Sequence, residues 1–290
     1  MRRLGGCVVI ALMLLACRTN ADTLLRQASV KWYSVGSSAV SEPTGVESMG
    51  VNPSGMVSAS NSQFISGYSS HFQNSFMTGM VGTTIPLSKT ITVGLIGAIR
   101  RVDDIPESMG QGLSGVKVGS FSDTEVTGKV GVAIQLNPNW SLGAAVGAYN
   151  HSVYSESGSQ WSIDLGTQYD FQIAKVGISV QNVGQRPVEW TSGQKDQRPM
   201  EINVGLSKTL GPVTGMVSAT QIDSKTECNI GVMLEVWDHL MITGGVQDVF
   251  DNWSGAVGVD LNLESFSLIY SYGQSTELGE THKLGLEVGI

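Results

Sequence analysis

The sequence has 290 residues, of which only 14% are charged, and its formal net charge is −8 at pH 7. This acidic balance disfavours nucleic acid and anionic surfaces as partners. No apolar run reaches the roughly 18 residues that a membrane-spanning helix needs, so we expect no such helix. The 36 glycines suit the crowded walls of a β-barrel but also a secreted adhesin, so composition alone does not decide the class.

Residues 1–21 have the features of a secretory signal peptide. A charged start at Arg2 and Arg3 precedes an apolar run, and the residues 19–21 form a cleavage site before the mature chain. The alternative is a lipobox, in which Cys17 is acylated after cleavage. We expect simple cleavage, and we leave residues 1–21 out of the fold prediction.

The mature chain is more acidic than the whole sequence. Without Arg2, Arg3 and Arg18, 14 of the 17 basic residues remain against 25 acidic ones, which gives a net charge of −11. Its one expected cysteine, Cys228, lies on the apolar face of a predicted strand. This excludes an internal disulfide framework and favours a small packed side chain.

The segment 22–61 differs from the rest of the chain. It begins with a short irregular stretch, and the following residues 34–49 are rich in Gly, Ser and other small side chains. Asn52 and Pro53 then favour a turn, and Gly55 permits a positive φ. We therefore expect an irregular segment before the first strand.

From Gln63 onward, apolar residues alternate with small or polar ones. In the window 91–100, for example, Ile91, Val93 and Leu95 face one way, while Thr92 and Gly94 face the other. Successive side chains on a strand point to opposite faces. An aliphatic face opposite a small, polar face is typical of a membrane β-barrel, whose outer wall contacts lipid. The pattern predicts about fourteen strands, at 62–71, 75–85, 89–100, 122–136, 140–150, 160–170, 173–183, 199–209, 213–221, 225–236, 239–247, 252–262, 265–273 and 281–290.

The lengths of the connections indicate how this barrel is oriented. Every second connection is tight, whereas longer ones are expected at 101–121, 151–159, 184–198 and 274–280. Outer-membrane barrels have short periplasmic turns and longer outside loops. We therefore predict an all-β fold, a transmembrane antiparallel β-barrel of about fourteen strands, in the outer membrane of a diderm bacterium.

Several short motifs resemble one known group of barrels. Residues 51–56 (VNPSGM) resemble the N-P-A-G-L signature of the FadL-like outer-membrane barrels, with Ser54 and Met56 departing from it. Residues 178–184, 199–206 and 279–284 resemble later strands of the PorV/PorQ-like branch. The resemblance spans about residues 34–290.

This resemblance implies a domain plan and a function. Residues 22–61 would form a plug in the lumen of the barrel 62–290. The plug signature would consist of Asn52, Pro53, Ser54, Gly55 and Met56. The implied function is passive uptake of small hydrophobic molecules such as long-chain fatty acids. The alternative is a PorV-like scaffold that binds exported proteins in a type IX secretion system.

The implied partners are therefore outer-membrane lipid and a hydrophobic small molecule, or proteins of a secretion system, with no nucleic acid. In the scaffold alternative, the loops 101–121 and 184–198 would contact the exported protein. Trp190 would be an exposed anchor for that partner or a ring at the membrane interface.

Uptake requires apolar side chains inside the barrel. The candidates are large apolar residues on the otherwise small or polar face of their strands: Ile65, Met80, Ile96, Met233, Met241 and Ile269. The alternative is that these side chains pack against the plug.

Nothing in the sequence points to covalent chemistry, so we expect no enzyme, no cofactor and no metal site. Of the four histidines, His151 is followed by Ser152, but sequence neighbours on a strand point to opposite faces and cannot form a base–nucleophile pair by adjacency alone. The acidic pairs at 103–104 and at 248 with 251 fit no calcium-loop spacing and are interpreted as solvated loop charge.

Overall fold

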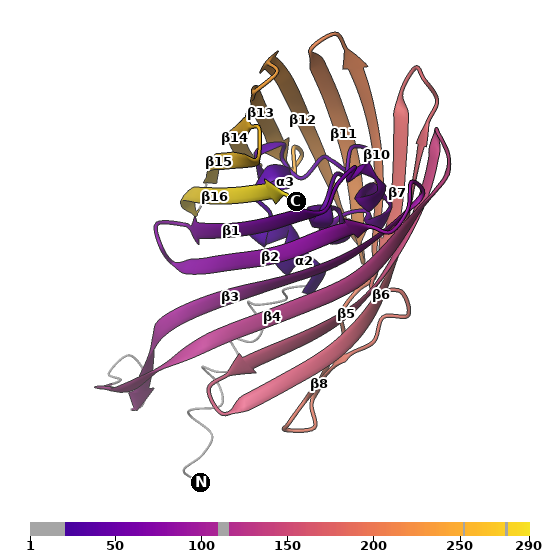
Figure 1. Ribbon diagram of the computed structural model, residues 1–290. Helices are drawn as coiled ribbons and strands as arrows, with labels where there is room; N and C mark the ends of the chain where they lie inside the picture. The colour runs from indigo at the N-terminus through magenta and orange to yellow at the C-terminus, as the bar shows by residue number, and fades with distance from the viewer. Residues whose placement is uncertain (1–20, 110–115, 252, 276–277) are drawn as a thin grey trace.

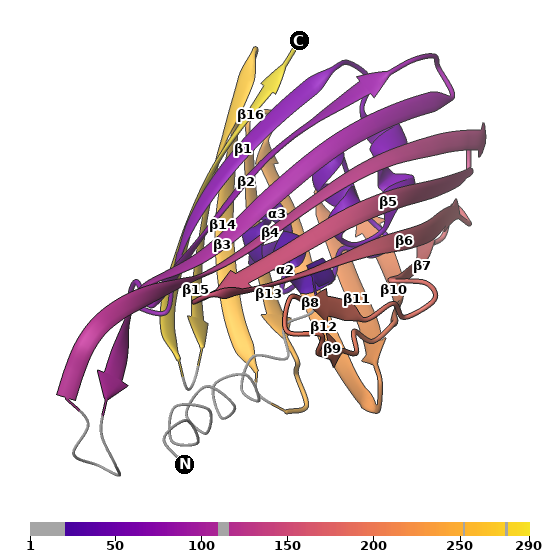
Figure 2. The ribbon, with the colours of Figure 1, turned by 90° about the horizontal axis from the view of Figure 1, so that it is seen from below.

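The computed structural model describes residues 21–109, 116–251, 253–275 and 278–290. The predicted signal peptide and the lipidation alternative at Cys17 therefore lie almost entirely outside the described residues. The described chain forms a closed antiparallel β-barrel, shown in Figures 1 and 2. Its strands are β1 (Gln63–His71), β2 (Phe76–Pro86), β3 (Ile91–Met109), β4 (Val116–Asn137), β5 (Trp140–Val153), β6 (Glu156–Asp170), β7 (Lys175–Gln181), β10 (Glu201–Leu210), β11 (Val213–Ile222), β12 (Lys225–Trp237), β13 (Leu240–Gln247), β14 (Ser254–Leu263), β15 (Phe266–Ser275) and β16 (Gly279–Gly289).

The barrel closes because its neighbouring strands pair in one continuous ring. The first strand pairs with the last, with Gln63 opposite Gly289, and β5 pairs with β6. Each of the fourteen strands named above matches one predicted range, so the predicted fold class is confirmed. Among the described residues, no helix has the length and hydrophobicity to cross a membrane.

Two predicted outside loops are wrong. Most of 101–121 is strand, because β3 continues to Met109 and β4 starts at Val116, and most of 151–159 belongs to β5 and β6. Polar side chains dominate these stretches and hide the two-residue alternation, yet the backbones still pair, with register shifts between β3 and β4 and a regular register between β5 and β6. In addition, β8 (Val188–Trp190) and β9 (Lys195–Asp196) form a small hairpin within 184–198 that pairs with β6.

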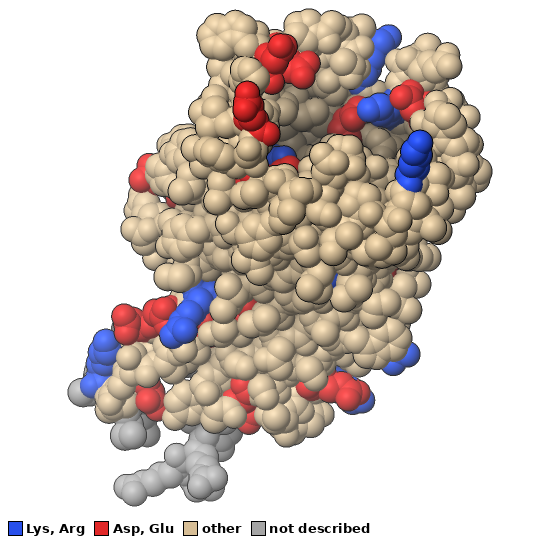
Figure 3. All heavy atoms as spheres, viewed as in Figure 1, with Lys and Arg blue, Asp and Glu red and all other residues tan. Residues whose placement is uncertain are grey.

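The two faces of the wall follow the predicted alternation. Leu95, Val130 and Val146 point outward and are more than half exposed, whereas Ala133 and Ala145 point inward and are buried. On the face in Figure 3, charged residues lie toward the two ends, and a broad band between them carries almost none. An apolar outer band of this kind suits contact with lipid.

The N-terminal segment lies inside the barrel, where Figures 1 and 2 show it in indigo. It contains α2 (Ala21–Ala28), α3 (Lys31–Ser34) and the two 3₁₀ helices η1 (Val46–Gly50) and η2 (Pro53–Ser58). Most of its side chains from Leu24 to Met56 are buried. Whether this segment blocks passage as a plug remains a prediction.

Glycines of the wall make room for this segment. A Cβ atom at Gly177 would overlap the backbone of Val40, and one at Gly245 would overlap the backbone of Val35. Because only glycine lacks a Cβ, the chain of the lumenal segment can approach the wall closely at these positions.

Candidate ligand cavity

The signature residues fasten the N-terminal segment to the wall. The Asn52 side-chain amide donates hydrogen bonds to the backbone oxygens of Val40, at 2.9 Å, and of Thr167 on β6, at 3.0 Å. Its Oδ1 atom accepts from the backbone N and the Oγ of Ser54, which caps η2. Both polar atoms of the Asn52 side chain are thus engaged in hydrogen bonds within the protein.

The other signature residues serve the same packing. Pro53 occupies the first turn of η2, where its missing N–H costs no hydrogen bond. Gly55 lies against Pro43 so closely that a Cβ atom would overlap that backbone. Met56 is fully buried in the apolar cluster between the segment and the wall.

The six predicted ligand-binding residues fall into two groups. Ile65, Met80 and Ile96 are buried in a cluster with side chains of the N-terminal segment such as Val30 and Met49. For these three residues, the structure favours the alternative of packing against the segment. Met233, Met241 and Ile269 instead line a cavity, and Ile269 also contacts the cluster.

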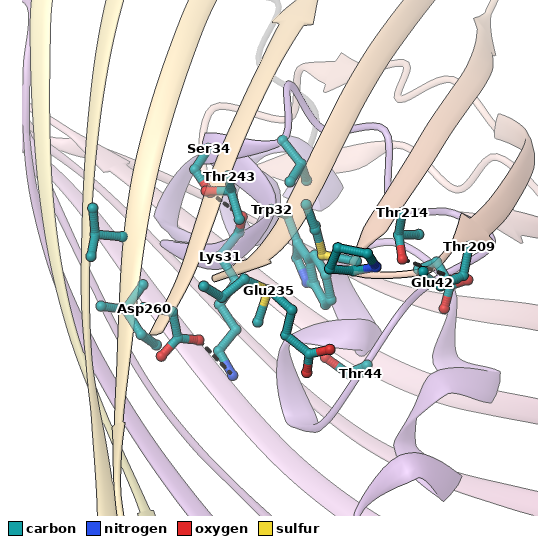
Figure 4. A pocket seen from close by; sticks show the side chains of 17 residues that line it. Lys31, Trp32, Ser34, Glu42, Thr44, Thr209, Thr214, Glu235, Thr243 and Asp260 are labelled. Atoms are coloured by element: carbon teal, nitrogen blue, oxygen red, sulfur yellow. Dashed lines mark hydrogen bonds and ion pairs between the residues drawn. The ribbon is translucent and has the colours of Figure 1, made fainter. Parts of the chain in front are cut away.

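The cavity has a volume of about 250 Å³ and lies between α3 and the wall formed by β10 to β15. The turn between β10 and β11, at Gly211 and Pro212, contributes to its lining, so the cavity lies toward the end of the barrel with the short turns. Figure 4 shows the side chains around it. Its apolar lining comes mainly from Trp32, Val35, Pro212, Met233, Met241 and Ile269.

Charged side chains occupy one side of the cavity. The Lys31 Nζ atom lies 2.5 Å from Glu287 and 3.9 Å from Asp260, and Figure 4 shows Lys31 pointing toward Asp260. Burial lowers the pKa of Lys31, but the carboxylates of Glu287 and Asp260 outweigh it and hold that pKa above its ordinary value. Lys31 is therefore a paired ammonium.

Sequence reasoning did not select the charged and aromatic residues of this lining. Lys31 and Trp32 belong to the irregular N-terminal segment, where no periodicity indicates which side chains face the wall. Asp260 did leave a signal, because it is a carboxylate on the inward face of a strand, which is unusual without a buried partner.

The opposite half of the lumen is polar. Ion pairs join Arg26 to Glu201 at 2.7 Å, and Lys129 to Asp164 at 2.6 Å, with all four side chains at most 7% exposed. Arg100 is paired with Glu125. These buried ion pairs distinguish this part of the lumen from the mainly apolar cavity.

Three of the polar residues form a geometry that could hold a metal ion, which the sequence did not predict. Ligand atoms of Asp123, Glu125 and His151 lie within 4.8 Å of one another, and the His151 Nε2 atom is 2.8 Å from Asp123. They come from β4 and β5, where Glu125 is opposite His151 in the register. Arg100 already balances the Glu125 charge.

The histidine positions agree with the argument against a base–nucleophile pair by adjacency. His151 is buried toward the lumen, whereas Ser152 is exposed and donates a hydrogen bond to Asn150. Trp190 is only partly buried, and neither expectation for it is tested. Its ring lies 5.1 Å from His151 and its Nε1 donates to Asp196, so it packs on the rim of the barrel.

The fold has close counterparts among solved structures. The Ralstonia pickettii toluene transporter TbuX is similar with a TM-score of 0.66 and 11% identity, covering 90% of this chain and 98% of that one. The Pseudomonas putida toluene transporter TodX has a TM-score of 0.65 and 11% identity, with 89% and 96% covered.

A Pseudomonas aeruginosa FadL homologue has a TM-score of 0.63 and 9% identity, with 90% and 98% covered. No family model matches the sequence, and no curated protein matches it. At these identities the comparisons show the fold alone, which this chain shares with the two toluene transporters and the FadL homologue.

Proposed function

We propose that this protein resides in the outer membrane and passively takes up small hydrophobic molecules, without covalent chemistry. The observation that carries the proposal is the cavity lined by Trp32, Met233, Met241 and Ile269 inside a closed barrel. Ligand sites are typically concave and mostly apolar, with few polar groups. The similar folds whose names state toluene transport support the same class of cargo.

The size of the cavity favours a small cargo. Its volume of about 250 Å³ is slightly below the range of ligand pockets, which usually span roughly 300–1,000 Å³. A molecule of the size of toluene fits this volume better than an extended long-chain fatty acid. Monoaromatic or short-chain apolar compounds are therefore the preferred substrates of the proposal.

The scaffold alternative, including the PorV/PorQ relationship, has less support. Its expected anchor, Trp190, is engaged by His151 and Asp196 on the barrel rim. An anchor residue for a partner normally fills a pocket of that partner. Binding of exported proteins therefore stays a prediction that rests on the sequence motifs.

The experiment is to measure toluene binding by the protein in lipid nanodiscs, with empty nanodiscs subtracted. Met241→Trp should fill the cavity and abolish saturable binding, because Met241 lines it. Met77→Trp is the matched control, since Met77 points outward near a strand end, where a Trp suits the membrane interface. Equal binding by both variants would contradict the proposal.

A further inference from the structure

We infer that the cavity selects by charge: it disfavours anionic ligands and prefers a small apolar amine to the matched carboxylate. This inference rests on the proposed function, because it names the head group that the same cavity accepts. It departs from the initial expectation of fatty acids, whose carboxylates are anionic at neutral pH. The argument comes from the charged side chains around the cavity.

Acidic groups outnumber basic ones around the cavity. The lining contains Lys31, Glu42, Glu235 and Asp260, so three carboxylates face one ammonium. Two further charged residues form ion pairs with residues of the lining: Glu287 pairs with Lys31, and Lys175 pairs with Glu42 at 2.9 Å. The full group holds four carboxylates and two ammoniums, which makes the local potential negative.

The lysine of the lining is not free to bind an anion. Lys31 lies between Glu287 and Asp260, and it also interacts electrostatically with the buried Glu47. A ligand carboxylate would have to displace one of these carboxylates and bring another negative charge beside the rest. Because the side chains of Lys31, Glu287 and Asp260 are at most 24% exposed, such repulsion is stronger here than at an open surface.

Glu42 is similarly occupied, since it accepts hydrogen bonds from Lys175 and from the Ser207 hydroxyl, at 2.9 and 2.8 Å. Glu235 is different. It lines the cavity and is exposed, and its carboxylate has no ion-pair partner among the residues that the structure describes. Glu235 is thus the group that an ammonium on an apolar ligand would meet.

The test compares hexylamine, hexanol and hexanoate, three probes with the same chain and different charge. Binding is measured by equilibrium dialysis against the whole protein in zwitterionic nanodiscs, with empty nanodiscs subtracted. We expect hexylamine to bind more tightly than hexanoate by about tenfold or more, with hexanol between them. The ratio should shrink at high salt.

The variant Glu235→Gln keeps the shape of the side chain and removes its charge, so the amine-to-carboxylate ratio should fall severalfold. Glu264→Gln is the matched control, because Glu264 lies at the same end of the barrel, exposed in the turn between β14 and β15 and outside the cavity. This control should leave the ratio unchanged.

The outcomes separate the inference from the proposed function. If hexanoate binds as tightly as hexylamine, or if Glu264→Gln changes the ratio as much as Glu235→Gln, the charge selection is overturned while uptake of apolar molecules stands. If none of the three probes binds and toluene does not bind either, both proposals are overturned together.

Discussion

The Lys129 Nζ atom lies 2.6 Å from the Asp164 carboxylate, although β5 separates their strands. The pair passes over Gly147 of β5, where a Cβ atom would come within 3.1 Å of the Lys129 side chain and 2.7 Å of the Ser162 hydroxyl. Lys129 also donates a hydrogen bond to the backbone oxygen of Met49 in the N-terminal segment, at 3.4 Å. One buried pair therefore joins three strands and the lumenal segment.

Replacing Asp164 by Ala should destabilise the barrel strongly. The change leaves the Lys129 ammonium buried and also removes a hydrogen bond from the backbone N of Asn182. Breaking a buried pair from one side typically costs about 3–5 kcal/mol. We expect a loss of that order in the free energy of unfolding, measured by urea titration of the protein in lipid vesicles.

The control is Asp103→Ala. Asp103 pairs with Arg101 at 2.8 Å, but both side chains are about half exposed. Surface pairs contribute only about 0–1 kcal/mol, so this variant should unfold close to the wild-type midpoint. Equal losses in the two variants would show that the lumenal pair does not hold the wall together.

Asn52→Ala should release the N-terminal segment without unfolding the barrel. The variant loses the hydrogen bonds to Val40 and Thr167 and the cap of η2. Loss of a cap alone costs about 1 kcal/mol, and of the two further bonds the one to Val40 is buried and the one to Thr167 is partly buried. We expect faster amide hydrogen exchange in residues 40–58, measured by mass spectrometry, with little change in the strands.

Asn139→Ala tests whether this effect is specific. Asn139 is exposed in the turn between β4 and β5, and its backbone, not its side chain, makes the recorded hydrogen bonds. Exchange in residues 40–58 should stay as in the wild type. Unchanged exchange in Asn52→Ala would mean that the signature does not fasten the segment.

Gly177→Ala should also displace the segment, through a steric effect on the wall side. The added methyl group would overlap the backbone of Val40, which a backbone cannot avoid by a rotamer change. Gly215→Ala adds the same methyl group where no atom lies within 4 Å. Limited proteolysis should cut the N-terminal segment faster in Gly177→Ala only, and equal rates would contradict the close approach.

The strands could be predicted from the sequence because their signal is local. The alternation of Val130 and Val132 with Gly131 and Ala133 gives both the strand and its outward face. The signal fails between 101 and 121, where both faces carry polar side chains beyond the apolar band. There, pairing with the neighbouring strand determines the conformation, and a single sequence does not contain that information.

The site could be predicted only in part. The alternation alone places Met233 and Met80 on the inward face. It does not show that Met233 lines the cavity whereas Met80 packs against the N-terminal segment, because that depends on the path of this segment through the lumen. The cluster of Asp123, Glu125 and His151 similarly depends on the register between β4 and β5. Contacts between distant parts of the chain decide both.

The orientation of the barrel gives the last prediction. Gln194 is exposed in the β8–β9 hairpin at the end of the longer connections. In a Cys228→Ser background, Gln194→Cys should react with a large, membrane-impermeant maleimide on intact cells. This follows because longer connections of outer-membrane barrels face outward.

Lys89→Cys is the matched control at the opposite end, since Lys89 is exposed in the short turn between β2 and β3. It should stay unlabelled on intact cells and react after the outer membrane is permeabilised. The cavity lies toward this same end, so the orientation also decides on which side a cargo leaves it. Labelling of Lys89→Cys but not of Gln194→Cys on intact cells would show that the barrel has the opposite orientation. The cavity would then lie at the outer end of the barrel, where a cargo enters.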